Sequence, residues 1–370
     1  MIRIFVTGLR GIPDVMGGVE SHCEALYPRL QRLSSAVEIT VVGRVPYVDA
    51  AKTRVAGLTV KGVPAVRSTS LEAISSTLLA VLYARLRRAD IVHIHAIGPA
   101  LTTGIARMLG LKVVVTHHGK DYARGKWGRL AKAMLKRGER AAMRHAHRVI
   151  CVSPSLREEL VSAFPEAAGR TVYIPNGVPG AAVAGDTARA EADRVLAAHG
   201  ARDGEFVLAV GRLVPEKGFD TLIDAANRMA SPPKLLIVGG SEHRSSYAER
   251  LTRKAGPQVR FAGMLPREVV FELQRRTALF VMPSFHEGLP IAALEAADAG
   301  APLLLSDIAA NRDLGLAPVN YFPVGDVDAL VAALAQPPRC YAVDADAVRD
   351  RFDWNRIAAE TLRVYEAFVP

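Results

Sequence analysis

One segment, residues 281–307, limits the possible folds of this chain more than any other. Its sequence, VMPSFHEGLPIAALEAADAGAPLLLSD, predicts an apolar strand over 278–282, a loop rich in Pro, Ser and Gly, and a short helix with Pro290 at its first position. Gly300 ends that helix, and a second apolar strand follows over 302–305. A strand, a helix and a strand in this order form the unit from which parallel sheets are built.

The start of this helix is a candidate anion site. Pro290 suits the first helical turn because it has no N–H group to leave unpaired and its φ angle is already helical. The backbone amides of Gly288, Leu289 and Ile291 then point out of the loop, at the positive end of the helix dipole. Phosphate groups bind readily at such a position.

Two carboxylates, Glu287 and Glu295, flank this helix start. If every step between them were helical, they would lie about 12 Å apart along the axis, from about 1.5 Å per residue. The carboxylate pair of a glycosidase is held closer, at about 5 to 9.5 Å. The spacing therefore favours a long ligand with hydroxyls at both ends and an anionic centre, such as a sugar, a diphosphate and a ribose. The alternative is that Glu287 only solvates a loop and Glu295 is an exposed helix residue.

Strand and helix patterns alternate along the whole chain, which predicts an α/β protein with parallel sheets covered by helices on both faces. The 370 residues are long for one hydrophobic core and suit two domains. We expect a first domain over 1–177, completed by an amphipathic helix over 354–370, and a second over 178–353. The expected strands are 2–7, 37–42, 58–63, 91–95, 112–117, 149–152 and 171–174 in the first half, then 206–210, 234–238, 258–261, 279–282 and 302–305.

Composition narrows the partners and the compartment. The chain is 50% hydrophobic and 23% charged, as folded soluble proteins are, and its net charge of +10 indicates an anionic partner. No apolar run is long enough for a membrane span, and we expect a cytoplasmic protein without a signal peptide. The three cysteines, Cys23, Cys151 and Cys340, have no metal or disulfide spacing and are expected to be buried small hydrophobes.

Two features of the first half could contact a ligand. The glycine-rich turn that ends in Gly17 and Gly18 could bring bare backbone amides to a phosphate, although it lacks dinucleotide-site spacing and could be only a tight turn. Histidines also follow the expected strands, and His118 at a strand end could donate a hydrogen bond near neutral pH. His93 and His95 could be structural, and no metal-ligand spacing such as H-E-x-x-H is present.

A helix expected over 127–145 has an apolar stripe, on which Leu130 falls, and a basic row facing elsewhere. The basic row and the residues before it comprise Arg124, Lys126, Arg129, Lys132, Lys136, Arg140 and Arg144. This row could bind anionic lipid headgroups or a lipid pyrophosphate at an acceptor and membrane face. The alternative is a merely solvated surface. In the second half, Arg212 and Lys217 follow a strand and could hold a diphosphate, or form a solvated basic pair.

Two motifs resemble a known family. Glu287-Gly-Leu-Pro-Ile-Ala-Ala-Leu-Glu295 and Val210-Gly-Arg-Leu-Val-Pro-Glu-Lys-Gly-Phe-Asp220 are similar to signatures of family 4 retaining glycosyltransferases with the GT-B fold. The resemblance implies two Rossmann-like domains facing an inter-domain cleft, with a C-terminal helix that crosses back to the first domain. Asp298 stands where this family usually carries a small or apolar residue.

The resemblance also implies roles for particular residues. Gly17 and Gly18 would meet the distal phosphate of the donor, and His118 would lie near the transferred sugar. Arg212, Lys217 and the start of the 290s helix would stabilise the leaving diphosphate, with Glu287 on the sugar and Glu295 on the ribose. Backbone contacts to the nucleotide would come from Gly240, Gly263 and Met264.

The stretch His118-Gly-Lys-Asp-Tyr-Ala-Arg-Gly-Lys-Trp-Gly-Arg129 is similar to a bacterial subgroup that builds exopolysaccharides and rhamnose-containing glycans. The implied enzyme is a retaining, metal-independent hexosyltransferase without a resident cofactor. It would use a UDP, GDP or dTDP sugar and a lipid-linked or saccharide acceptor for surface polysaccharide synthesis, as a cytoplasmic protein peripheral at the inner face of the plasma membrane.

Two alternatives stay open from the residues. One is a nucleotide-sugar epimerase of the same fold, which would need further acid and base carboxylates near the sugar. The other is a non-enzymatic basic adaptor for a membrane or a nucleic acid. Little aromatic interleaving and no recognisable motif argue against nucleic acid as a partner.

Overall fold

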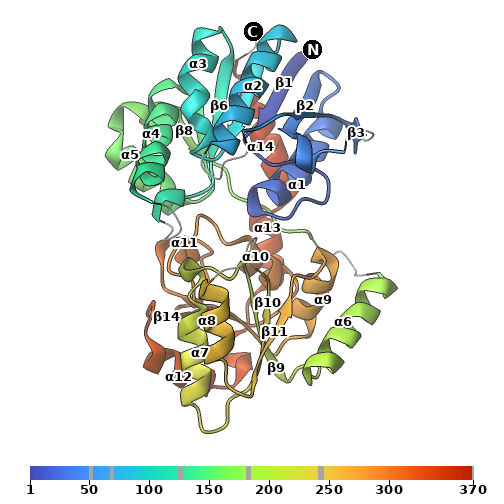
Figure 1. Cartoon of the computed structure of the whole chain (residues 1–370), viewed down its shortest axis with the longest axis vertical. Helices are drawn as coiled ribbons and strands as arrows, with labels where there is room; N and C mark the ends of the chain where they lie inside the picture. Colours follow the sequence, from blue (N-terminus) through green and yellow to red (C-terminus); the bar gives the residue numbers. More distant parts are fainter. Residues whose placement is uncertain (50–52, 67–70, 124–127, 181–184, 241–245, 369–370) are drawn as a thin grey trace. The chain divides into compact units, whose positions relative to one another are not determined.

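The computed structural model describes residues 1–49, 53–66, 71–123, 128–180, 185–240 and 246–368 (Figure 1). The chain divides into two compact units, one formed by Met1–Gly177 with Phe352–Pro370 and the other by Val178–Arg351. Each unit is built on its own sheet, whose strands are almost all parallel. The expectation of two Rossmann-like α/β halves is confirmed.

The first unit contains an eight-stranded sheet in the order β3-β4-β2-β1-β5-β6-β7-β8. Every neighbouring pair is parallel except β3 with β4, and β3 is a two-residue strand that the sequence did not predict. The bounds are β1 Ile2–Thr7, β2 Val37–Arg44, β3 Arg54–Val55, β4 Leu58–Val63, β5 Ile91–His95, β6 Lys112–His117, β7 Arg148–Cys151 and β8 Thr171–Tyr173.

Helices cover this sheet and connect its strands (Figure 1). The α-helices are α1 Gly18–Leu33, α2 Glu72–Leu86, α3 Thr103–Met108, α4 Arg129–His145, α5 Pro154–Ala163 and α14 Trp354–Glu366. Short 3-10 turns are η1 Val45–Tyr47, η2 Pro99–Thr102, η3 Asp121–Ala123 and η4 Pro165–Arg170.

The last helix, α14, belongs to the first unit although it lies at the other end of the chain. Its residues Trp354, Ile357 and Tyr365 are buried in the hydrophobic core that also contains strands β1 and β2. This confirms that the C-terminal helix returns to the N-terminal domain. Burial of a large aromatic side chain at each end of the helix holds it there.

The contact between Gly177 and Trp354 gives a test of this docking. A Cβ atom added at Gly177 would lie 2.5 Å from Cδ2 of the Trp354 ring, whereas one added at Gly169 would meet nothing within 4 Å. We expect Gly177→Ala to lower the free energy of unfolding of the first unit by about 1 to 3 kcal/mol, because overpacking forces the ring to move. Gly169→Ala should stay within about 0.5 kcal/mol of the wild type. Denaturant titration of both variants would check this, and equal stability of the two would contradict it.

The second unit contains a six-stranded parallel sheet in the order β11-β10-β9-β12-β13-β14. The strands are β9 Phe206–Val210, β10 Lys234–Val238, β11 Val259–Gly263, β12 Leu279–Met282, β13 Leu303–Ser306 and β14 Tyr321–Phe322. The helices are α6 Asp186–His199, α7 Phe219–Arg228, α8 Ser246–Lys254, α9 Arg267–Arg276, α10 Ile291–Asp298, α11 Ala309–Arg312, α12 Val327–Leu334 and α13 Ala345–Arg351, with 3-10 turns η5 Pro215–Lys217, η6 Pro318–Asn320 and η7 Pro338–Tyr341.

Both sheets have a strand-order switch that locates a ligand site. In the first unit the chain winds outward from β1 through β2, then restarts on the other side of β1 with β5. In the second unit it winds from β9 through β10, then restarts on the other side of β9 with β12. Ligands of open parallel sheets bind beyond the carboxyl ends of the strands at such a switch. The loops after β1 and β5, and those after β9 and β12, are therefore the expected positions of ligand sites.

Several details differ from the sequence-based expectations. Pro290 precedes α10 as its N-cap, with an extended backbone (φ −77°, ψ 95°), instead of occupying the first helical position. Leu130 is 73% exposed and does not pack with the apolar stripe of α4. Cys340 is exposed, whereas Cys23 and Cys151 are buried as expected. None of the described helices combines the length and the apolar character that crossing a bilayer requires.

Candidate functional site

The strongest feature of the second unit is a contact between Lys217 and Glu287. Nζ of Lys217 donates to Oε1 of Glu287 at 2.6 Å, and both side chains are mostly buried, at 18% and 11% exposure. Lys217 follows β9 and Glu287 follows β12, so the pair lies at the strand-order switch. The alternative that Glu287 only solvates a loop is therefore wrong. The alternative that Lys217 is a solvated cation is wrong as well.

Gly218 allows these two loops to meet. Its φ is +67°, and an added Cβ would lie 2.0 Å from the carbonyl oxygen of Pro283. Next to it, the amide of Phe285 donates to the carbonyl oxygen of Glu216 at 2.8 Å. Only glycine combines the left-handed backbone with this close approach, which explains the Lys-Gly pair in the sequence.

Hydrogen bonds from buried polar side chains hold the loop that carries Glu287. Oγ of Ser284 donates to Oε1 of Glu287 at 2.7 Å, and Oγ of Ser306 donates to the carbonyl oxygen of Ser284. Nδ2 of Asn311 then donates to the carbonyl oxygen of Ser306 at 2.8 Å. Since Ser284, Ser306 and Asn311 are fully buried, these bonds fix the position of the carboxylate. These three residues could not be identified from the sequence, because single Ser and Asn residues form no motif.

Glu295, the other flanking carboxylate, is not an exposed helix residue. It lies 12% exposed on α10, and Oε1 accepts from Nη2 and Nε of Arg267 at 2.6 and 2.9 Å. Burial raises the pKa of Glu295, and the Arg267 guanidinium opposes that shift. Arg267 begins α9, directly after the β11 loop, and was not identified from the sequence. The structure thus gives Glu295 a protein partner at the place where a ribose was expected.

The predicted nucleotide-contacting residues lie at the carboxyl ends of neighbouring strands. Arg212 follows β9, Gly240 follows β10, and Gly263 ends β11 with Met264 after it. A Cβ on Gly240 would lie 2.8 Å from Cγ of Met264, so these two loops touch. Met264 is 59% exposed. The sheet therefore places these residues along one edge, next to the strand that leads to Lys217.

The start of α10 lies between the two carboxylates. Leu289 and Pro290 are buried, while Gly288 and Ile291 are partly exposed. The carbonyl oxygen of Pro290 accepts from the amides of Ala293 and Leu294, at 3.1 Å each, and closes the first turn. The helix is eight residues long and runs directly into the buried Asp298.

Asp298 has a partner that compensates for its charge. Its side chain is fully buried, and Oδ1 accepts from Nε of Arg349 at 2.7 Å. Arg349 lies on α13, which packs against α10 within the same unit. This ion pair explains how an acid is accommodated at a position where a small or apolar residue was the expectation.

In the first unit, the glycine-rich turn already contains a carboxylate. Backbone N and Nε of Arg10 donate to Oε1 of Glu20 at 2.9 and 3.3 Å, and Glu20 lies in the first turn of α1 at 6% exposure. Gly17 has φ +153°, and a Cβ there would lie 2.0 Å from Oε2 of Glu20. The backbone angle at position 17 and the nearby Glu20 carboxylate therefore explain the glycine there without any ligand. Gly18 is the first residue of α1, and its phosphate contact stays a prediction.

Four histidines and two tyrosines form a buried group beside the carboxyl ends of β5 and β6. The hydroxyl of Tyr27 lies 3.0 Å from Nδ1 of His93 and 2.5 Å from Nε2 of His95. Nδ1 of His95 in turn lies 2.9 Å from Nε2 of His118. The remaining contacts are His93 Nδ1 with Tyr365, His93 Nε2 with Thr116, and His22 Nδ1 with Asn176. His93 and His95 are thus structural members of a network that ends at the partly exposed His118.

Burial keeps these imidazoles neutral. It lowers the pKa of His22 to about 4 and that of His93 to about 3, and it lowers the pKa of His95 and His118 well below 6.5. The neighbouring rings add to the effect for the last three, since two adjacent imidazolium ions repel each other. At neutral pH, His118 is therefore a neutral hydrogen-bonding group.

These shifts predict how stability depends on pH. In the unfolded chain the histidines take up protons below a pKa of about 6.5, whereas in the folded chain His22 and His93 stay neutral down to about pH 4. The pKa values of His95 and His118 are lowered as well. Their contribution to stability is therefore complete above pH 6.5 and is lost as the pH falls. Between pH 7 and pH 5 we expect the free energy of unfolding of the first unit to drop by about 2 kcal/mol or more. Denaturant titrations at both pH values would measure this, and His22→Gln should weaken the dependence. A flat profile would contradict it.

The basic row on α4 is exposed. Arg129, Lys136, Arg140 and Arg144 are exposed and Lys132 is partly so. The one acid on the helix, Glu139, is buried and bonded to Nε2 of His117 at 3.2 Å. It therefore does not neutralise the row, and Arg137 adds a further exposed charge on this helix. Arg124 and Lys126 lie outside the described residues.

Two family models cover most of the chain. Residues 16–180 match the model described as Glycosyltransferase Family 4. Residues 193–337 match the model described as Glycosyl transferases group 1. The first match lies in the first unit except for residues 178–180, which belong to the second unit. The second match lies entirely in the second unit.

Similar proteins agree with these matches. A curated relative, the alpha-maltose-1-phosphate synthase of Mycolicibacterium smegmatis, is 27% identical over 95% of this chain and 96% of its own length. Among solved structures, sucrose-phosphate synthase of Thermosynechococcus elongatus matches 99% of both chains with a TM-score of 0.76 and 21% identity. Anabaena HepE in complex with UDP-glucose matches 98% of this chain and 100% of its own, with a TM-score of 0.74 and 19% identity. These likenesses confirm the GT-B fold.

Proposed function

We propose that this chain, which carries a glycosyltransferase family 4 domain followed by a glycosyl transferases group 1 domain, transfers a hexose from a nucleotide diphosphate sugar to a lipid-linked or saccharide acceptor. The reaction retains the anomeric configuration and needs no metal. The observation that carries the proposal is the mostly buried contact of Lys217 with Glu287 at the strand-order switch of the second unit. Binding of UDP-glucose by HepE, which has the same fold, supports the choice of donor.

Lys217 and Glu287 would exchange partners when the donor binds. Without a ligand, each charge compensates the other in a site where little water can reach them. A diphosphate offers Lys217 a stronger partner, together with Arg212 and the amides at the start of α10. Glu287 is then released to accept hydroxyl groups of the sugar, held in place by Ser284. Positive groups fixed in advance around the departing diphosphate lower the barrier most where charge develops.

His118 would act in the first unit as a neutral group near the transferred sugar. One ring nitrogen is engaged by His95, and the partly exposed ring leaves the other for a hydroxyl group. Gly17 and Gly18 at the start of α1 would contribute amides to the distal phosphate. Attack from the face of the leaving group would retain the anomeric configuration without a covalent nucleophile, as the resemblance to retaining glycosyltransferases implies.

The acceptor would be presented at a membrane surface. The basic row of α4 is largely exposed, and the one acid of this helix, Glu139, is buried, which suits anionic headgroups or a lipid pyrophosphate. The exposed Leu130 beside it could enter the headgroup region. This supports a peripheral protein at the inner face of the plasma membrane that takes part in surface polysaccharide synthesis.

Incubation with UDP, GDP and dTDP sugars would test the function. We expect release of one nucleoside diphosphate, an unchanged rate in EDTA, and a product whose anomeric configuration matches the donor. The matching diphosphate should raise the melting temperature, because it binds only the folded state. Epimerisation of the donor without transfer, or a strict need for Mg²⁺ or Mn²⁺, would overturn the proposal.

A further inference from the structure

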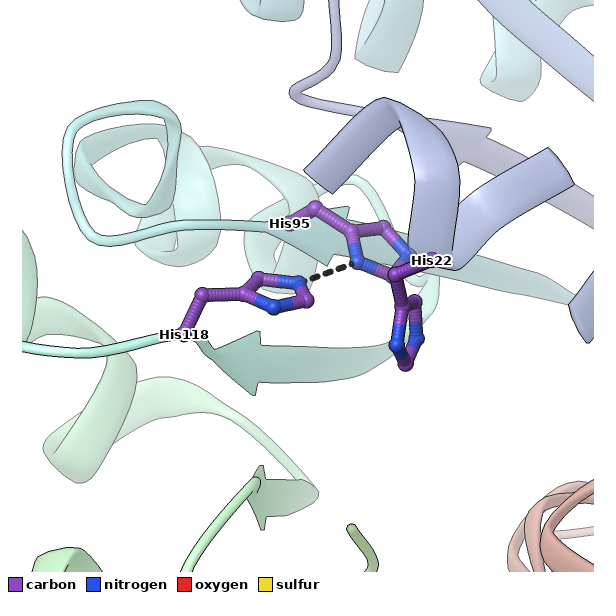
Figure 2. Close-up of side chains that lie close together, drawn as sticks. All are labelled: His22, His95 and His118. Atoms are coloured by element: carbon purple, nitrogen blue, oxygen red, sulfur yellow. Dashed lines mark hydrogen bonds between the residues drawn. The ribbon is translucent and has the colours of Figure 1, made fainter. Parts of the chain in front are cut away.

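Three histidine rings from distant parts of the sequence converge in the first unit (Figure 2). His22 lies on α1, His95 ends β5, and His118 follows β6. One ring nitrogen from each lies within 4.8 Å of the other two. His22 and His95 are buried, and His118 is partly exposed, so His118 is the member of the group that solvent reaches.

The partner of His22 assigns its free nitrogen. Oδ1 of Asn176 is 2.9 Å from Nδ1 of His22, and an amide oxygen can only accept, so Nδ1 carries the proton. Nε2 therefore carries a lone pair. It is buried and has no hydrogen-bond partner among the described residues, although His22 is only 3% exposed. A buried lone pair without a donor is unfavourable unless something binds it.

His95 and His118 present a second unusual contact. The hydroxyl of Tyr27 lies 2.5 Å from Nε2 of His95. Nδ1 of His95 then faces Nε2 of His118, at 2.9 Å (Figure 2). When His95 donates from Nε2 to Tyr27, its Nδ1 carries a lone pair and His118 supplies the single proton between the two rings. Movement of that proton to Nδ1 of His118 would leave a lone pair on each of the two facing nitrogens.

We propose that His22, His95 and His118 bind one divalent transition metal ion of the Zn²⁺ class, through His22 Nε2, His95 Nδ1 and His118 Nε2. Ligand nitrogens about 2.0 to 2.1 Å from Zn²⁺ are about 3.3 Å apart in a tetrahedral site. The His95 and His118 nitrogens would therefore move slightly apart from 2.9 Å, and the His22 nitrogen would approach from within 4.8 Å. The fourth position would be open toward the exposed side of His118. Three imidazoles and no carboxylate favour Zn²⁺, Co²⁺, Ni²⁺ or Cu²⁺ over Mg²⁺ and Ca²⁺, which prefer oxygen.

The surroundings meet two further requirements of such a site. Metal ligands are neutral imidazoles, and burial already keeps these rings neutral at pH 7. Histidine ligands usually bond through their second nitrogen to a fixed partner, as His22 does to Asn176 and His95 to Tyr27. A bound ion would hold Nε2 of His118 and so fix the orientation of its ring. One consequence, which rests on the proposed function, is a change in the rate of transfer when Zn²⁺ is added.

Metal binding can be measured without any nucleotide sugar. The full chain, made without a polyhistidine tag and stripped with a chelator, would be titrated with Co²⁺ and then with Zn²⁺. We expect one equivalent of Co²⁺ to give the visible absorption of a tetrahedral site, and Zn²⁺ to remove it. His118→Ala and His22→Gln should each lower the affinity about 100-fold or more, and Asn176→Ala about 10- to 100-fold. His145→Ala, an exposed histidine of α4, should bind as the wild type does.

Circular dichroism and melting curves would show which variants fold. If the buried His22→Gln variant does not fold, His118→Ala decides, because His118 is partly exposed and lies in a loop. Absence of saturable one-equivalent binding to the wild type would overturn the metal site, and so would wild-type affinity in His118→Ala. Because no donor sugar is present, neither result depends on whether the chain is a glycosyltransferase.

Discussion

Replacing Lys217 with alanine is expected to lower the rate of sugar transfer about 100- to 1,000-fold, the usual effect of removing one group that stabilises developing negative charge. Affinity for the free nucleoside diphosphate should fall as well. Glu287→Ala should also impair transfer about 100-fold, but it should leave the affinity for the free diphosphate unchanged or higher, because Lys217 is released from its 2.6 Å contact. Initial rates and isothermal titration with the nucleoside diphosphate would separate the two effects.

Glu295→Ala should behave in the opposite way to Glu287→Ala. If Glu295 accepts the ribose hydroxyls, its removal weakens binding of the free nucleoside diphosphate and of the donor alike. Glu268→Ala, an exposed residue on α9 next to Arg267, is the matched control and should change neither. Equal loss of nucleotide affinity in the Glu287 and Glu295 variants would contradict the two-ended site. Unchanged nucleotide affinity in Glu295→Ala would mean that this carboxylate serves only Arg267.

Reversal of three charges on α4 is expected to abolish binding to anionic liposomes. Each basic residue near an anionic surface contributes about 1 kcal/mol, so loss of Lys132, Lys136 and Arg140 alone weakens binding more than about 100-fold. The three new glutamates add repulsion. Co-sedimentation of the wild type should also fade with salt, because the screening length shrinks from about 8 Å at 0.15 M to about 3 Å at 1 M.

The control must change the net charge by the same amount elsewhere. Arg194, Arg253 and Arg275 are exposed residues of the second unit, and their reversal to glutamate gives the same net charge as the α4 variant. This control should still sediment with anionic liposomes, and neither variant should sediment with uncharged ones. Should the α4 variant bind as the wild type does, the basic row is only a solvated surface and the acceptor need not be lipid-linked.

The sequence alone determined the class of fold and most of the strands. The run Phe206–Val210 and the centre of Lys112–His117 are apolar on both faces, which is the pattern of a parallel sheet covered by helices. The structure has both strands at the predicted bounds. Glycine and proline indicated the turns, because glycine widens the range of allowed backbone angles and proline restricts it. The position of Arg212, Lys217 and Glu287 after strands also followed from this local pattern.

Contacts between distant residues were decided only by the tertiary structure. The pairing of Lys217 with Glu287 spans 70 residues, and it depends on β9 and β12 being neighbours, which no local pattern specifies. Arg267 beside Glu295 and Arg349 beside Asp298 are of the same kind, since charged residues at helix ends usually face water.

The histidine cluster is the clearest case. His22 has the position of an ordinary inward-facing residue of α1, and nothing in its sequence neighbourhood connects it with His95 or His118. The three rings meet because α1 places His22 against His95, which ends β5, and against His118, which follows β6. The spacing of apolar residues along a helix or strand indicates which of its faces is buried. It does not indicate which other helix or strand packs against that face. The lowered pKa values of the histidines, the unpartnered nitrogen of His22 and the candidate metal site therefore result from tertiary packing and could not be read from the local sequence.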